Sequence, residues 1–112
     1  MIDWKKLEKV MLRLGFDDYV KGTDYLREAV RIWDARPHLA LSKELYPEIA
    51  RKYGTRWTCV ERAIRHASES AMLRGEQKAW EDYFGASYKC EIGRPTCGQL
   101  ISRLARVACG AE

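Results

Sequence analysis

Apolar residues recur along this chain at intervals of three and four, and almost nowhere at intervals of two. The first spacing places side chains on one face of a helix, whereas a half-buried strand alternates apolar and polar residues. Leu26, Ala29, Val30 and Trp33 show the helical pattern in full. The sequence therefore predicts an all-α fold, a compact bundle of six or seven helices.

Glycine and proline mark where the predicted helices end. Gly15, Gly54, Gly75 and Gly85 stand at helix stops, and Pro37 ends the second helix before it. Residues 86–94 show no period and read as a loop. The predicted helical stretches are about 4–14, 26–33, 39–45, 47–53, 58–74, 76–84 and 96–108.

Two local signals support these boundaries. Pro47 suits the first turn of the fourth helix, where its missing N–H costs nothing. Thr96 and Gln99 have the spacing of a capping box at the start of the last helix.

Length and composition exclude several classes of protein. At 112 residues the chain forms one domain, and 46% hydrophobic with 32% charged residues is typical of soluble globular proteins. No apolar run approaches the ~18 residues of a membrane span. The N-terminus does not resemble a signal peptide, so we expect a cytoplasmic protein without membrane contact.

The cysteines do not form a metal-binding pattern. Cys59, Cys90, Cys97 and Cys109 contain no C-x-x-C pair, and there are only two histidines. We expect free thiols, no metal and no cofactor. The sequence also has no phosphate-binding glycine loop and no Ser/His/Asp arrangement, so we expect no enzyme.

Positive charge is concentrated in one window of the chain. Between Ala50 and His66 the only acid is Glu61, and the window carries the whole formal net charge of +4. Local concentration of this kind favours a polyanionic partner, although a solvated charged face is the simpler alternative. The basic residues of the window are Arg51, Lys52, Arg56, Arg62 and Arg65.

The same window has the spacing of a helix-turn-helix motif. Ala50 supplies a small residue where two helices cross, Gly54 follows four positions later in the turn, and Val60 follows six positions after that. The second helix then has small apolar residues on one side. Its other side and the preceding turn form a candidate base-reading face of seven residues: Arg56, Thr58, Cys59, Glu61, Arg62, Arg65 and His66.

Each of these residues also has a structural explanation. Thr58 and Glu61 have capping-box spacing, His66 fits a surface histidine, and the arginines fit solvated helix charges. Trp57 is expected to be a hydrophobic staple or a core residue and not a base-stacking platform, and the other tryptophans are expected in the core. The combination with the helix-turn-helix spacing favours binding of double-stranded DNA, with Lys52 on a phosphate.

Five stretches of the chain carry a resemblance to a known family. KGTDYLREAV, KELYPEIARKYGT, VERAIRHA, RGE followed by FG, and RPT resemble the C-terminal effector domains of the stage 0 sporulation protein A family of Firmicutes, over about residues 10–108. The resemblance implies an all-α domain that binds promoter DNA and controls transcription, with its recognition helix at about 58–71. It further implies tandem copies on DNA, contact with the sigma subunit of RNA polymerase and a basic phosphate contact at Arg94.

The chain also departs from the family at named places. Cys59 stands where the family has a base-reading arginine, which predicts a relaxed or altered target sequence. Trp80, Glu81 and Asp82 differ in character from the family's sigma-contact region. Residues 1–112 are expected to form a single effector-like domain without a receiver domain. The alternative function is a protein-interaction module that retains the fold and acts as an antagonist or partner of a full-length regulator or of RNA polymerase.

Overall fold

The computed structural model describes residues 2–85 and 95–109, and within these residues it contains helices and no strand. The predicted all-α bundle is confirmed, while the predicted loop at 86–94 lies outside the described residues. The elements in chain order are α1 (Trp4–Leu14), α2 (Lys21–Ala35), the π-helical turn η1 (Leu41–Leu45), α3 (Tyr46–Tyr53), α4 (Trp57–Arg74), α5 (Gln77–Phe84) and α6 (Cys97–Ala108).

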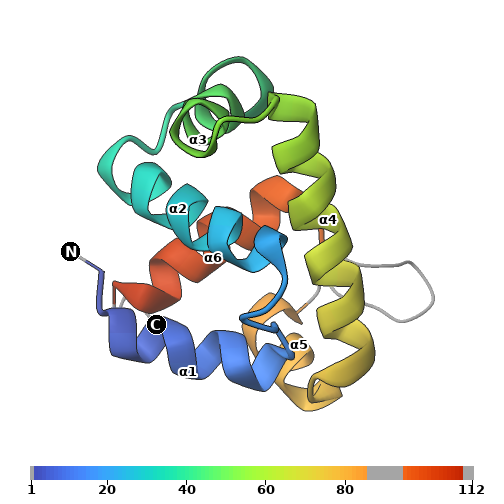
Figure 1. Ribbon diagram of the computed structural model, residues 1–112. Coiled ribbons are helices and arrows are strands. Elements are labelled where there is room, and N and C mark those ends of the chain that lie inside the picture. The colour runs from blue at the N-terminus through green and yellow to red at the C-terminus, as the bar shows by residue number, and fades with distance from the viewer. Residues whose placement is uncertain (1, 86–94, 110–112) are drawn as a thin grey trace.

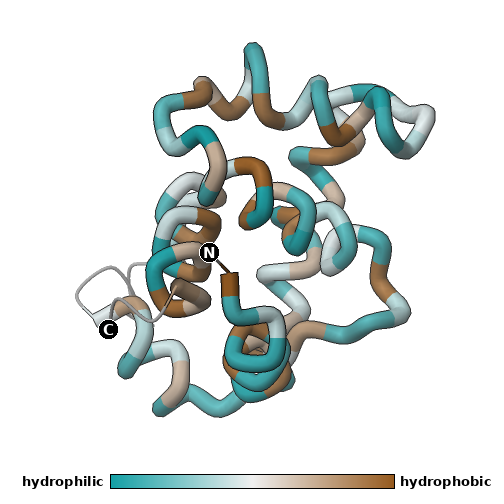
Figure 2. Tube along the Cα trace, turned by 90° about the vertical axis from the view of Figure 1, so that its left-hand side faces the viewer, coloured by the Kyte–Doolittle hydropathy of each residue, from teal (hydrophilic) through white to brown (hydrophobic). Residues whose placement is uncertain are grey.

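α2 lies at the centre of the bundle, packed against both α4 and α6 (Figure 1). α4 runs along one edge of the molecule, with α3 at its N-terminal end and α5 beyond its C-terminal end. Hydrophobic and hydrophilic residues alternate in short stretches along the helices, as amphipathic helices require (Figure 2). One core forms where their apolar faces meet.

The closest helix crossing explains why α4 has small apolar residues on its inner face. A Cβ atom added to Gly22 of α2 would lie 2.0 Å from the Ala63 carbonyl oxygen and 2.8 Å from the Ala67 Cβ atom. A larger side chain at 67 would hold α2 and α4 apart, whereas at 63 the contact is with the backbone itself. The alanines of α4 therefore serve close packing, and the helix is pressed tightly onto the bundle.

The four tryptophans do not share one environment. Trp80 is 1% exposed and donates its indole N–H to the Leu14 carbonyl at 2.9 Å, so it is a core residue and not part of a contact surface. Trp33 is partly buried against the core. Trp4 and Trp57, by contrast, are 42% and 40% exposed, and the prediction of a core position for them is wrong. Each stands at the first position of its helix, where neighbours cover only one side.

The third predicted helix is a single π-helical turn that leads directly into α3. The N–H groups of Glu44 and Leu45 both donate to the Ala40 carbonyl at 3.0 Å, and the Tyr46 N–H donates to Leu41, five residues back. The Glu44 carboxylate accepts from the Ala40 N–H at 2.9 Å and closes the start of the turn. Pro47 is tolerated in the first turn of α3, as expected.

Candidate nucleic-acid interface

α3 and α4 form the helix-turn-helix that the spacing predicts. Gly54 ends α3 with φ 67° and ψ 40°, a left-handed conformation that favours glycine. The Thr55 N–H donates to the Ala50 carbonyl at 2.9 Å and closes the turn. Ala50 is 5% exposed and Val60 is fully buried, so both residues occupy the positions expected of them at the crossing.

α4 separates into two faces along its whole length. The buried residues are Val60, Ile64, Ala67, Ser68 and Ala71. Ser68 was not anticipated; its hydroxyl donates to the Arg65 carbonyl at 2.8 Å, which satisfies it within the helix. The candidate base-reading residues Arg56, Thr58, Cys59, Arg62, Arg65 and His66 are all exposed, and Glu61 is intermediate.

The exposed residues lie close together on this face. At 100° per residue, the side chains from Thr58 to His66 that the sequence assigns to the face span an arc of about 160°. Thr58, Arg62 and Arg65 follow one another down its middle. The structure thus brings the predicted residues of α4 together on one continuous surface, and Arg56 stands at its N-terminal end, in the N-cap position just before the helix.

The basic side chains on this face are mostly unengaged. Within residues 2–85 and 95–109, Arg56 and Arg62 form no ion pair. Arg65 lies 4.0 Å from the Glu61 carboxylate, four residues earlier, and both side chains are substantially exposed. Such a surface pair contributes little to stability. These guanidinium groups are therefore available to an external anion.

The capping box predicted at Thr58 and Glu61 is wrong. α4 begins at Trp57 with Arg56 as its N-cap, so Thr58 is already the second residue of the helix. No side chain in the part of the chain that the structure describes caps this start. The Cys59 and Val60 N–H groups donate to the Arg56 carbonyl, and the positive end of the helix dipole is left open to an anion.

Lys52, the predicted phosphate contact on α3, has a partner inside the protein. Its ammonium group donates to Glu28 Oε2 at 2.8 Å, and Glu28 also accepts from the guanidinium of Arg31. Burial works to raise the pKa of Glu28, but the hydrogen bonds from Arg31 and Lys52 outweigh it and hold the pKa below its usual range. Nothing in the sequence signals this pair, because 24 residues separate its members.

The start of α6 lies beside the same face. Arg65 lines a shallow hollow together with Pro95, Thr96 and Cys97. The predicted capping box is confirmed here: the Thr96 N–H donates to Gln99 Oε1 at 2.9 Å, and the Gln99 N–H donates to Thr96 Oγ1 at 3.1 Å. The other predicted phosphate contact, Arg94, lies outside the described residues.

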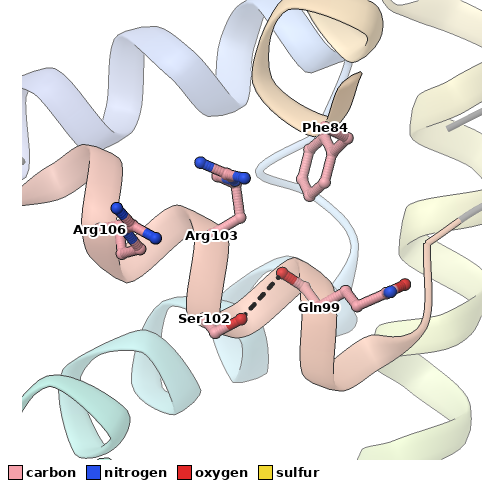
Figure 3. A pocket seen from close by; sticks show the side chains of 5 residues that line it. All are labelled: Phe84, Gln99, Ser102, Arg103 and Arg106. Carbon is pink, nitrogen blue, oxygen red and sulfur yellow. Dashed lines mark hydrogen bonds between the residues drawn. The ribbon is translucent and has the colours of Figure 1, made fainter. Parts of the chain in front are cut away.

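A second hollow lies along α6. Phe84 comes from α5, and the other four lining side chains come from α6 (Figure 3). Its one hydroxyl, on Ser102, donates to the Gln99 carbonyl at 3.2 Å and has no histidine beside it in this hollow. The arrangement has none of the features of a nucleophile activated by a base. The α6 residues are Gln99, Ser102, Arg103 and Arg106.

Metal ligands, disulfides and membrane-spanning helices were sought among the described residues. No three His, Cys, Asp or Glu side chains among them are grouped as metal ligands, and Cys59, Cys97 and Cys109 form no disulfide with one another. None of the helices is both long and apolar enough to cross a membrane.

Comparison with known protein families agrees with the geometry of α3 and α4. The family model described as "Sporulation initiation factor Spo0A C terminal" matches residues 7–107 of the 112. The match includes the whole helix-turn-helix and ends one residue before the end of α6. This chain belongs to the Spo0A C-terminal family, the DNA-binding effector domain of a sporulation response regulator and not an enzyme family.

Proposed function

We propose that this chain binds duplex DNA sequence-specifically and regulates transcription of the sporulation-initiation type, with α4 inserted in the major groove. The observation that carries the proposal is the division of α4 into a tightly packed inner face and an exposed face with unengaged arginines. The 18 residues of α4 give a helix about 27 Å long. Its N-terminal half, which would approach the bases, holds the exposed Arg62 and Arg65.

The residue types on this face suit recognition of base edges. Arg56, Arg62 and Arg65 carry the forked donors that pair with guanine or phosphate. Glu61 can accept from a cytosine amino group. Thr58 and His66 offer shorter hydrogen-bonding groups, which complete the proposed set with Cys59.

Cys59 is the residue that would change the target. Its thiol is a weak donor and cannot form two parallel hydrogen bonds to one base. A bidentate pair is worth ~1–3 kcal/mol of discrimination between bases. Because phosphate contacts supply much of the affinity, we expect altered or relaxed specificity at one base pair and retained DNA binding.

Phosphate contacts are assigned to Lys52 and Arg94, and the open start of α4 is suited to a third. Further partners follow from the family. A neighbouring copy on tandem sites and the sigma subunit of RNA polymerase are the candidates. Glu81 and Asp82 are exposed on α5, where the family's sigma contact aligns.

The test is binding to a labelled duplex with tandem sites of the sporulation-regulator type and to a scrambled duplex, titrated across salt. We expect a steep salt slope and a preference for one duplex, which Arg62→Ala with Arg65→Ala abolishes. The matched control is Lys5→Ala with Lys9→Ala, which removes the same charge from exposed positions on α1. Weak binding that is equal on both duplexes and equal in both double variants would contradict the proposal.

A further inference from the structure

Glu28 is a carboxylate in an unusual place. It lies in the middle of α2 with only 9% of its side chain exposed, and it holds two cations at once. Arg31 is one turn further along α2 and pairs with Oε1, while Lys52 reaches Oε2 from α3. A buried carboxylate is retained only when such partners compensate its desolvation.

We propose that Glu28 is a positioning residue for DNA binding, which holds the Lys52 ammonium ready for a DNA phosphate. This inference rests on the proposed function of α3 and α4. Lysine is flexible, and immobilising its side chain on binding costs affinity. Glu28 fixes the side chain before DNA arrives, and the ammonium group has three N–H donors, of which Glu28 engages one.

The surroundings of Lys52 support this role. The side chain is 55% exposed although its end is hydrogen-bonded, so it remains open to an external acceptor. It also lies 5.7 Å from the ring centroid of Tyr53, which itself packs edge-on against Tyr25 of α2. Lys52 is thus held from two sides next to the turn of the helix-turn-helix.

A second ion pair, between the C-terminal end of α2 and α3, provides a control. Arg36, the residue that follows the end of α2, donates to the Glu48 carboxylate of α3 at 2.5 Å. Glu28→Gln and Glu48→Gln each remove one acid and one α2–α3 pair, and each raises the net charge by one. They differ in the cation freed from the α2–α3 pair, Lys52 or Arg36, and Glu28→Gln also releases Arg31 from Glu28. If the pairs only linked α2 to α3, Lys52→Met would weaken DNA binding equally in the two variant backgrounds.

The direction of the effect distinguishes positioning from general electrostatics. Removing an acid near a DNA-binding surface tightens binding if only net charge matters. Positioning requires the opposite result. We therefore expect Glu28→Gln to weaken binding roughly fivefold, the scale of one side chain that must be ordered on association.

The experiment is a double-mutant cycle by fluorescence anisotropy on the preferred duplex, with Lys52→Met in the wild-type, Glu28→Gln and Glu48→Gln backgrounds. In the wild type and in Glu48→Gln, Lys52→Met should weaken binding and lower the salt slope by about 0.9, one phosphate contact. In the Glu28→Gln background, Lys52→Met should cause almost no further change in affinity or in salt slope. Thermal unfolding of each variant verifies that it folds.

Three results would overturn the inference. The first is DNA binding by Glu28→Gln that equals or exceeds that of the wild type. The second is the same loss of affinity on Lys52→Met in the Glu28→Gln and Glu48→Gln backgrounds. The third is a salt slope that Lys52→Met leaves unchanged in the wild type. If Glu28→Gln does not fold, Glu28→Asp keeps the charge but shortens the reach, and it should also weaken binding. Failure of the proposed function would be recognised separately. In that case the wild-type protein would bind both duplexes equally, and Arg62→Ala with Arg65→Ala would not change its affinity.

Discussion

Replacement of Gly22 by alanine tests the packing that presents α4. The new methyl group would stand 2.0 Å from the Ala63 carbonyl oxygen, about 1.4 Å inside the 3.4 Å at which ordinary contact begins. The methyl group would be fixed to the α2 backbone, and the carbonyl is part of the α4 backbone. Neither can move by a rotamer change, as a long side chain could. The substitution therefore forces α2 and α4 apart.

Two opposing effects set the expected change in the free energy of unfolding of Gly22→Ala. Alanine in place of glycine gains up to ~1 kcal/mol of helix propensity, because Gly22 has no positive φ. Overpacking of a rigid contact costs ~1–3 kcal/mol, and a shift of whole helices lies at or above the upper end. We expect a net loss of about 2 kcal/mol or more. For a domain near 100 residues this lowers Tm by about 8 °C or more.

The assay is urea and thermal unfolding of three glycine-to-alanine variants. Gly54→Ala meets no atom within 4 Å but places alanine at φ 67°, so it should cost about 1 kcal/mol from backbone strain alone. Gly98→Ala meets only the flexible end of Leu41 at 3.3 Å and should be neutral or slightly stabilising. A Gly22→Ala protein as stable as Gly98→Ala would refute the reasoning. It would mean that the contact between α2 and α4 can relax freely.

Three further predictions follow from the structure. Cys59→Arg should sharpen discrimination at one base pair by ~1–3 kcal/mol, measured by competition between duplexes that differ only there. Tyr46→Phe should change stability by no more than about 1 kcal/mol in urea unfolding, because among the described residues the buried hydroxyl has only the weakly hydrogen-bonding Cys97 thiol beside it. The pKa values of Glu28, Glu48 and Asp17 lie below their ordinary values of 4.5, 4.5 and 3.8. Their contribution to stability should therefore be complete above about pH 5 and decrease as pH falls through 4 and below, as urea midpoints at pH 7, 4 and 3 would show.

Local signals in the sequence predicted the boundaries of most elements. Gly15 and Gly54 end their helices in the left-handed conformation, and Thr96 with Gln99 forms its capping box, because each signal acts within a few residues. The α4 start was misjudged by the same kind of reasoning. Thr58 has the right spacing from Glu61, but the chain had already entered the helix at Trp57.

Features that depend on distant residues could not be predicted in this way. The π-helical turn at 41–45 continues into α3 without a break, and no propensity distinguishes it from a short α-helix. The pair of Glu28 and Lys52 and the contact of Gly22 with Ala63 each join residues that are far apart in the chain. The exposed face of α4 is the part of the predicted interface that follows from the helical period alone.

The division of α4 into two faces also bears on how such a domain diverges. Thr58, Cys59, Arg62 and His66 are exposed, and a substitution at such a surface position usually changes stability by no more than about 0.5 kcal/mol. The inner face has no such freedom, since Ala63 and Ala67 lie against Gly22. Under the proposed function, mutation of this face would change the target sequence while the scaffold stays constant, and Cys59 stands at one of these exposed positions.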